Sequence, residues 1–356
     1  MPGPYVVGVV DGEGIGPEVV GAARTVLRAL ERVTDLRFDV HDGGDVGLPS
    51  RTGGGLREET AAFFAGIFAA GGAVLCGPAG GRFVYDVRAR FDLFCKIVPL
   101  RPSPTLVDAS VVRPELLADV DVLLVRENVA GLYFGEFGRR SDGHVAYQHL
   151  SYDAAQVARI IAVAADLART RRGHLTVVVK RGGVPAVSAL WAEQAALAAD
   201  RGDVVIDVLE VDNAGFQMIA RPGTFDVVVT PNLFGDVLAD SATVLLGSRG
   251  MSYSANFGPD RRAVYQTGHG AAHDLAGTDR ANPVAQILSL AAMLRESFGR
   301  PETARLLETA IERVLADGIR TADIAGPGST VVGTRALTEH IVQELDGIAR
   351  VRAEAS

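Results

Sequence analysis

Short apolar runs alternate with longer amphipathic segments along this chain, and this alternation is the feature that most limits its possible folds. Aliphatic and β-branched runs of this kind are typical of buried strands, and apolar residues at helical spacing are typical of helices that cover a sheet. Their alternation predicts an α/β fold. The expected strands cover residues 5–10, 73–76, 120–125, 175–179, 204–211 and 225–230, and the expected helices cover 19–30, 154–170, 187–199, 285–298 and 302–316.

Length and composition are those of an ordinary globular protein. With 356 residues the chain is long enough for two domains. A net charge of −8, without a run of Lys and Arg interleaved with aromatics, argues against a nucleic-acid partner. Cys76 and Cys95 belong to no Cys-x-x-Cys pair, so neither a disulfide framework nor a zinc site is indicated. The apolar start is short and interrupted by Asp11, and no segment reaches the length of a membrane span, so we expect a cytoplasmic protein.

Two acidic residues in the segment 232–240 have the spacing of one helical turn. Asp236 and Asp240 therefore share one face of a helix. The residues between them are apolar or small, so no cation partner is expected beside either carboxylate. Such a pair suits a hard divalent cation such as Mg2+ or Mn2+, which takes oxygen ligands. A solvated acidic helix face or a helix cap explains the same spacing.

The wider segment FDVVVTPNLFGDVLADSATVLLGSRGMSYSANFG (residues 225–258) resembles the metal-site region of the β-decarboxylating dehydrogenases. That family contains isocitrate, homoisocitrate, 3-isopropylmalate and tartrate/D-malate dehydrogenases. The resemblance runs from Gly12 to about Gly333, with the motifs in family order. It implies an isopropylmalate-dehydrogenase-like fold of two domains, with a mixed sheet flanked by helices, and not a Rossmann fold. The implied cofactor-binding domain is discontinuous, and the second domain holds the metal site and the interface of a homodimer with shared active sites; their residues are 1–98 plus 249–356, and 99–248.

Two motifs correspond to the family's carboxylate-binding arginines. VRARFDLF (87–94) places Arg88 at one such position, and RENVAGLYFG (126–135) places Arg126 at another. A guanidinium fork suits bidentate binding of a carboxylate. Arg88 and Arg90 point about 200° apart on a helix, so only one of them can face a given site.

The resemblance also implies the catalytic residues and a third metal ligand. Tyr133 would be the acid that protonates the enol carbon after CO2 leaves. Lys180 would act as, or relay to, a base at the substrate hydroxyl of the partner subunit, which requires a lowered pKa. Asp212, in VDNAGFQ (211–217), would bind metal and substrate across the dimer interface.

Two further segments correspond to the family's dinucleotide site. GEGIGPE (12–18) lacks the G-x-G-x-x-G spacing and resembles the turn beside the nicotinamide, with Glu13 in place of the usual Asp. TGHGAAHDLAG (267–277), followed by ANP (281–283), resembles the adenosine-binding loop. Asp274 would accept hydrogen bonds from the ribose hydroxyls and repel a 2′-phosphate, which predicts NAD as the cofactor. The implied cofactor contacts are Ile15, His269, Gly270, Asp274, Leu275 and Asn282.

The chain departs from the family near the substrate's third substituent. Val98 stands where a second substrate arginine is usual, and either Lys96 or Arg101 could replace it. The preceding loop, residues 77–86, is shorter than in isopropylmalate enzymes. The favoured interpretation is a polar or anionic substituent held by Arg82 or Lys96. In the alternative, Arg82 and Lys96 are solvated and Arg101 restores the usual site.

The predicted function is NAD-dependent oxidative decarboxylation of a 3-substituted malate, with Mg2+ or Mn2+ as the metal. The cation would lower the pKa of the substrate's 2-hydroxyl and stabilise the enolate left by decarboxylation. Alternatives are a 3-isopropylmalate dehydrogenase, a D-malate/tartrate dehydrogenase, or a non-catalytic regulatory subunit of a family oligomer. Oxidation without decarboxylation and a metal-dependent lyase are further alternatives.

Overall fold

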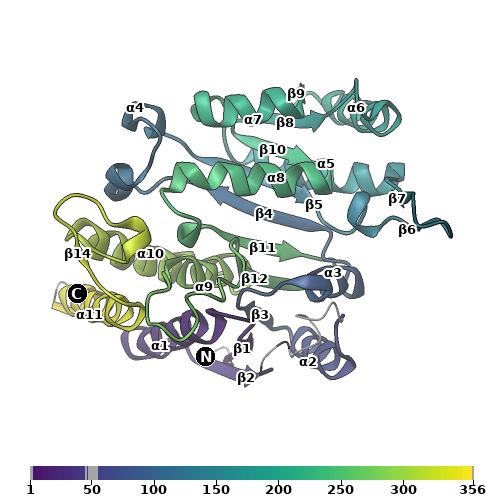
Figure 1. Ribbon diagram of the computed structural model, residues 1–356. Coiled ribbons are helices and arrows are strands. Elements are labelled where there is room, and N and C mark those ends of the chain that lie inside the picture. The colour runs from purple at the N-terminus through teal and green to yellow at the C-terminus, as the bar shows by residue number, and fades with distance from the viewer. Residues whose placement is uncertain (1–2, 45, 47–54, 355–356) are drawn as a thin grey trace.

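A single mixed sheet of ten strands runs through the protein, as seen in a computed structural model that describes residues 3–44, 46 and 55–354 (Figure 1). Its strands are β1 Tyr5–Val10, β2 Phe38–Asp42, β3 Ala73–Cys76, β4 Cys95–Leu100, β5 Val122–Glu127, β8 His174–Val179, β9 Val205–Glu210, β10 Val227–Thr230, β11 Tyr253–Phe257 and β12 Ala263–Thr267. Their order across the sheet is β2-β1-β3-β12-β11-β4-β5-β10-β8-β9.

Antiparallel pairing is confined to the middle of this sheet. Strand β4 runs antiparallel to β5 and to β11, and β11 runs antiparallel to β12. The pairs on either side, such as β1 with β3 and β10 with β8, are parallel. The mixed sheet confirms the predicted fold class and differs from the mostly parallel sheet of a Rossmann fold.

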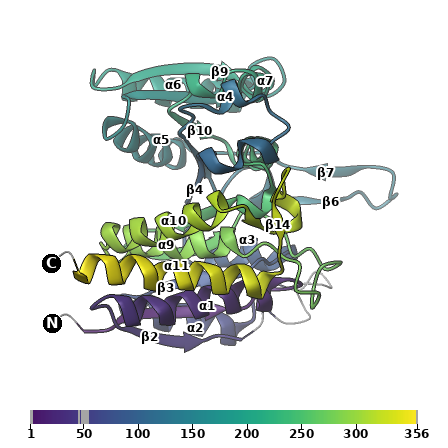
Figure 2. The same ribbon diagram turned by 90° about the vertical axis from the view of Figure 1, so that its left-hand side faces the viewer.

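Helices cover both faces of the sheet. They are α1 Gly16–Val33, α2 Glu58–Ala69, α3 Gly81–Arg90, α4 Pro114–Leu117, α5 Ala154–Arg169, α6 Pro185–Ala199, α7 Val211–Ala220, α8 Asn232–Ala242, α9 Val284–Glu296, α10 Pro301–Ala316 and α11 Thr334–Glu354. Figure 2 shows α1, α9, α10 and α11 gathered in one half and α5, α6 and α7 in the other. A two-stranded hairpin projects from the body in the same view; it consists of β6 Phe137–Arg139 and β7 Ala146–Gln148.

Helix α1 shows how the sequence sets local structure near the cleft described below. Gly12 and Gly14 have φ of 78° and 57°, which L side chains rarely adopt. A Cβ on Gly14 would also lie 1.9 Å from the carbonyl oxygen of Ala271. Pro17 then suits the first helical turn, and apolar residues at helical spacing, including Val19, bury one side of the helix in the core.

The structure confirms the predicted strands and helices within one to three residues at their ends. It also contains β4, β11, β12, α2 and α11, which the apolar pattern did not reveal. The segment expected as a loop, residues 77–86, is helical from Gly81 because α3 begins there.

Several other features bear on the expectations. Cys76 and Cys95 are free and buried. In the described part of the chain, no helix combines the length and apolar character needed to cross a membrane. A remaining two-stranded sheet pairs β13 Ile319–Arg320 with β14 Thr330–Val331. The division into two domains stays a prediction, and its first boundary falls within the continuous strand β4.

Candidate active site

Two clefts lie on opposite faces of the sheet, and β4 contributes to the walls of both. Successive side chains of a strand point to opposite faces, so Lys96 and Val98 line one cleft while Ile97 and Pro99 line the other. The first cleft has a volume of about 260 Å3 and gathers predicted substrate, metal and cofactor residues. Its lining includes Arg88, Lys96, Arg126, Asp236, Asp240, His269 and Gly270.

The alternation of β4 decides where Arg101 lies. Arg101 lines the second cleft, which has a volume of about 960 Å3, together with Ile97 and Pro99. It therefore cannot restore the arginine that is missing at Val98, and that alternative is wrong. Lys96 is the cation that β4 places in the first cleft.

Helix α3 supplies Arg88 to the first cleft. Arg88 is buried, whereas Arg90 on the other side of the helix is exposed and lies 3.8 Å from Glu58. Burial, and then the charge of Arg126, lowers the pKa of Arg88 to about 9. Arg82 is directed elsewhere: its guanidinium pairs with Asp86 at 3.2 Å and it is absent from the described lining of the cleft.

Arg126 is the second-last residue of β5 and is almost completely inaccessible to solvent. Its Nε donates to Asn232 Oδ1 at 2.9 Å, and its Nη1 contacts Asp236. Its Nη2 is buried without a hydrogen-bond partner. One donor of this guanidinium is thus left for a ligand.

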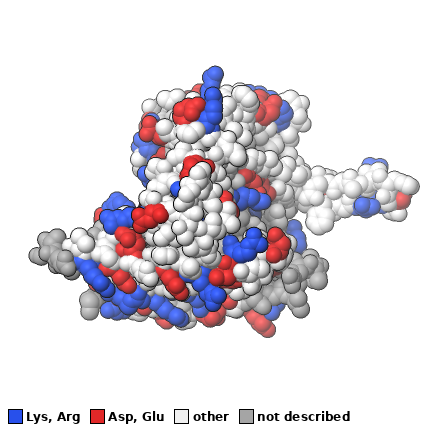
Figure 3. All heavy atoms as spheres, turned by 60° about the vertical axis from the view of Figure 1, so that its left-hand side comes forward, with Lys and Arg blue, Asp and Glu red and all other residues white. Residues whose placement is uncertain are grey.

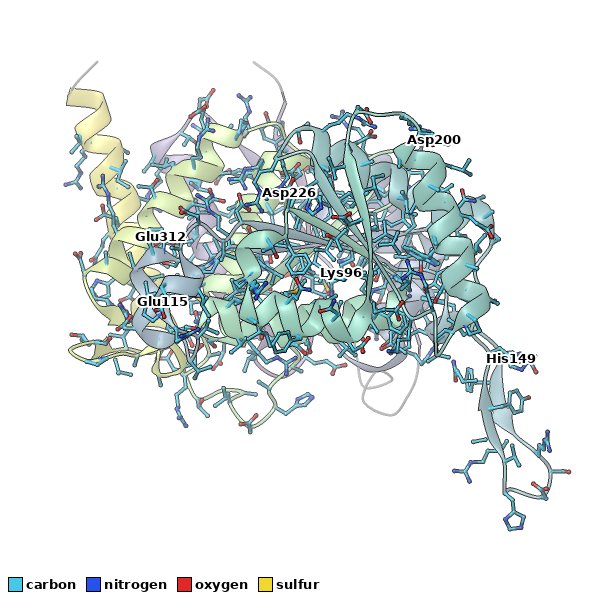
Figure 4. All side chains as sticks on the ribbon, turned by 90° about the horizontal axis from the view of Figure 1, so that it is seen from above. Lys96, Glu115, His149, Asp200, Asp226 and Glu312 are labelled. Atoms are coloured by element: carbon cyan, nitrogen blue, oxygen red, sulfur yellow. The ribbon has the colours of Figure 1, made fainter. Side chains whose placement is uncertain are left out.

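Lys96 lies directly opposite Arg126 in the register of β4 and β5. Facing residues of an antiparallel pair have their Cβ atoms about 5 Å apart, and like charges there destabilise the sheet. Burial, then the charges of Arg88 and Arg126, holds the pKa of the Lys96 ammonium well below its ordinary value. Figure 4 shows Lys96 in the middle of the molecule, unlike His149 at the base of the hairpin.

Tyr133 lies on a short 3-10 helix, η3 Leu132–Phe134, beside the arginines. Its hydroxyl donates to Asp236 Oδ2 at 2.7 Å, and the ring lies 5.7 Å from the Arg126 guanidinium. Burial, followed by the hydrogen bond to Asp236, raises the pKa of Tyr133. The phenol therefore keeps its proton at neutral pH.

The three predicted metal aspartates all have cation partners, so the expectation that they would have none is wrong. Asp236 contacts Arg126, Asp240 pairs with Arg249 at 2.7 Å, and Asp212 pairs with Lys180 at 2.9 Å. Although burial acts to raise it, the charge of Arg126 holds the pKa of Asp236 below its usual value. Sequence distance hid the partner of Asp236, since 110 residues separate it from Arg126.

Lys180 and Asp212 form a pair outside the lining of their own chain's cleft, as far as the described residues show. The hydrogen bond that Lys180 donates to Asp212 raises the pKa of Lys180, contrary to the lowered pKa expected from the sequence. The same bond lowers the pKa of Asp212. Within one chain, no group of three or more His, Cys, Asp or Glu among the described residues could hold a metal ion.

The predicted cofactor segments lie together at one end of the cleft. The backbone N–H of Ile15 donates to the carbonyl of Ala271 at 2.9 Å, which ties the start of α1 to the loop 267–277. Ile15 and Leu275 belong to one small apolar cluster. Gly270 lines the cleft and Asp274 is exposed.

Two polar atoms beside this loop are buried without partners. They are Nε2 of His269 and Oε1 of Glu13. Burial lowers the pKa of His269, so its imidazole is neutral near pH 7. Asn282, by contrast, uses its side chain within the fold: it donates to Asp323 at 3.1 Å and accepts from the N–H of Val284 at 3.0 Å.

Comparison with known proteins agrees with this geometry. The sequence profile described as isocitrate/isopropylmalate dehydrogenase matches residues 6–341. The chain belongs to the isocitrate/isopropylmalate dehydrogenase family. Members of this family are NAD(P)-dependent decarboxylating oxidoreductases, and the chain is such an enzyme.

Individual relatives cover the chain almost completely. A 3-isopropylmalate dehydrogenase of Gloeobacter violaceus is 39% identical over 96% of this chain and 98% of its own length. One from Shouchella clausii is 38% identical over 95% and 96% of the two chains. Among solved structures, an isocitrate dehydrogenase from Methylococcus capsulatus superimposes with a TM-score of 0.84 at 31% identity, covering 96% of this chain and 99% of that one.

One cleft residue of this family member was missed in the sequence. Arg249 lies on η6 Arg249–Met251, lines the cleft and pairs with Asp240. The only local signal was a basic residue in the glycine-flanked turn 247–250 that follows α8.

Proposed function

We propose that this dehydrogenase oxidises a 3-substituted malate with NAD and releases the 3-carboxylate as CO2. The observation that carries the proposal is an excess of cations in the cleft. Arg88 and Lys96 form no ion pair within the described part of the chain, and Arg126 keeps one buried donor free. Buried charges need partners, and a substrate with two or three carboxylates supplies them.

The residues of the cleft match the steps of this reaction. Oxidation takes a hydride from C2 and a proton from the 2-hydroxyl. The new carbonyl then accepts the electrons of the C–C bond that breaks as CO2 leaves. Arg88 and Arg126 hold the departing carboxylate, and Tyr133 gives its proton to the enol carbon. The phenol of Tyr133, which donates to Asp236, carries the proton that this step needs.

A divalent cation fits the carboxylates of α8. Asp236 and Asp240 both line the cleft and offer hard oxygen ligands. When bound, Mg2+ or Mn2+ supplies positive charge to the substrate's 2-oxygen. Because the described residues of one chain offer no third acid at this place, Asp212 of a second copy completes the proposed ligand set.

NAD fits the other end of the cleft. The buried, unpartnered atoms of His269 and Glu13 are available to a ligand. Gly270, Ile15 and Leu275 lie in the same region, and the exposed Asp274 is free to accept from ribose hydroxyls. A carboxylate there favours NAD over NADP.

The proposed substituent at C3 is polar or anionic. Lys96 faces the cleft beside Arg88 and Arg126, and a compact ammonium suits an anion. Arg82 is not part of this proposal because it pairs with Asp86. A second candidate substrate is 3-isopropylmalate, which the names of the relatives favour; D-malate or tartrate would need no large substituent pocket.

A homodimer with shared active sites would supply Asp212 from a second copy of the chain. Phe216 on α7 and Val237 on α8 are large apolar side chains that are 72% and 57% exposed. An exposed apolar surface of this kind is typical of an interface. In the proposed two-domain division these helices belong to residues 99–248.

The surface charge favours a small-molecule enzyme over a nucleic-acid binder. Figure 3 shows the hairpin projecting beyond the body, and positive and negative charges interleave on the face in that view.

The test is a panel of 3-substituted malates with NAD and Mn2+, in which NADH and CO2 are measured together. We expect both products in equal amounts, and a higher kcat/KM for an isocitrate-like acid than for 3-isopropylmalate. NADH without CO2 would contradict decarboxylation, and no turnover by the isolated protein with any acid would favour the regulatory-subunit alternative.

A further inference from the structure

An ion pair lies on the wall of the active-site cleft, at the proposed metal site. Arg249 Nη2 donates to Asp240 Oδ2 at 2.7 Å, from η6 to α8. Both side chains line the cleft, and they are 58% and 50% exposed. An exposed pair of this kind contributes little to stability, so it can be broken by a competing ligand.

The backbone that carries Arg249 is fixed, whereas the side chain is not. Asp323 accepts hydrogen bonds from Ser248 Oγ at 2.6 Å and from Asn282 at 3.1 Å. A Cβ on Gly250 would lie 2.6 Å from Asp323 Oδ2, so the turn fits closely against that carboxylate. Only the long Arg249 side chain has freedom to change its partner.

The guanidinium and a divalent cation compete for one carboxylate. A cation bound to Asp240 would place two like charges within a few ångströms of each other and repel the guanidinium. Next to Arg249 the cleft wall continues through Thr267, Gly268 and His269, a stretch without any other cation. His269 also has a buried ring nitrogen without a partner there.

We propose that Arg249 is an anion-binding side chain of the cofactor end of the cleft, held on Asp240 until a divalent cation takes that carboxylate. The anion is a phosphate of the dinucleotide, because the wall beside Arg249 is the predicted cofactor loop. This inference rests on the proposed metal site at Asp240. It makes cation and dinucleotide binding mutually favourable, and such coupling is reciprocal.

The test measures binding without turnover. Mn2+ is titrated calorimetrically into the whole protein, and NADH binding is followed by fluorescence with and without Mn2+. In Arg249→Met we expect Mn2+ alone to bind at least about fivefold more tightly, because the internal competitor is gone. The strengthening of NADH binding by Mn2+, expected in the native protein, should disappear in this variant.

Two variants serve as controls. Arg249→Lys keeps the charge and should keep the coupling. Arg262→Met removes an arginine that pairs with Asp260 at 3.4 Å outside the described cleft lining, and it should behave as the native protein. The thermal midpoint of each variant should stay near the native value, since both lost pairs are solvent-accessible.

The outcomes separate this inference from the proposed function. In one outcome the native protein binds Mn2+ and Asp240→Asn does not, which supports the metal site. If Arg249→Met then equals the native protein in Mn2+ affinity and in the coupling between Mn2+ and NADH, only the role of Arg249 is overturned. If neither native protein nor Arg249→Met binds Mn2+, the proposed metal site fails and the inference fails with it.

Discussion

Lys96 is the residue whose surroundings most distinguish this cleft. It faces Arg126 across β4 and β5 and has Arg88, Asp236 and Asp240 as charged neighbours. Because its pKa is lowered, the neutral fraction grows as pH rises through that lowered pKa. An anionic substituent binds the charged form, so its KM should rise with increasing pH in the range where Lys96 loses its proton.

Replacement of Lys96 tests this expectation. Lys96→Met should raise the KM for an isocitrate-like acid by about ten- to a hundredfold, since hydrogen bonds to charged groups are worth about 1.5–3 kcal/mol. Lys96→Arg should keep affinity and lose the pH dependence. Measuring KM against pH for native and variant enzymes checks both, and a clear preference for 3-isopropylmalate that Lys96→Met leaves unchanged would contradict an anion pocket.

Asp274 governs the expected choice of dinucleotide. A 2′-phosphate would meet its carboxylate at the cofactor loop, and like charges at close range cost on the order of a few kcal/mol. We expect kcat/KM with NADP to be about a hundredfold lower than with NAD. Asp274→Asn should reduce the ratio of kcat/KM with NAD to kcat/KM with NADP. If the native enzyme is equally efficient with both cofactors, the loop binds the ribose in a different way.

At the scale of elements, α8 links metal and substrate because it carries Asp236 and Asp240 one turn apart. Excess chelator should abolish turnover, and added Mn2+ should restore it. Asp240→Asn should need a higher Mn2+ concentration for half-maximal rate, because a neutral amide is a weaker ligand for a hard cation. Full turnover in chelator would remove the metal from the mechanism.

The sequence predicted those elements whose apolar pattern is simple. Strands such as β1, β3 and β10 are continuous apolar runs, so their burial on both faces could be predicted from the sequence. Strand β11 was not, because Ser254 and Asn256 are buried polar residues that interrupt its pattern. Strand β4 was missed for a similar reason, because Lys96 and Pro99 interrupt its apolar pattern.

The sequence predicted several residues of the site but not the ion pairs between them. Motif positions named Arg88, Arg126 and Asp236, and the fold brings these three into one cleft. The partners of the aspartates could not be read from spacing, because each pair joins different elements. Arg249 and Asp240 are only 9 residues apart, yet their contact depends on how the turn after α8 folds back.

At the scale of the whole molecule, we expect two copies of the chain to form a homodimer with shared active sites. Lys180 and Asp212 lie outside the described lining of their own chain's cleft, whereas Arg88 lies in it. Mixing inactive Lys180→Ala with inactive Tyr133→Phe should restore activity, because one of the two sites in a heterodimer then has both residues intact. Subunit exchange should be confirmed with two distinguishable tags; exchanged mixtures without activity would contradict shared sites.

The strand order also constrains how the chain is made. Strand β3 lies between β1 and β12, and β4 lies between β5 and β11. During synthesis, β3 and β4 each have an unpaired edge until the ribosome has passed residues 253–267. Such edges invite pairing with other chains, and long-range strand pairing is slow. The active-site wall is thus completed late in translation, and the edges of β3 and β4 stay open to aggregation until β11 and β12 emerge.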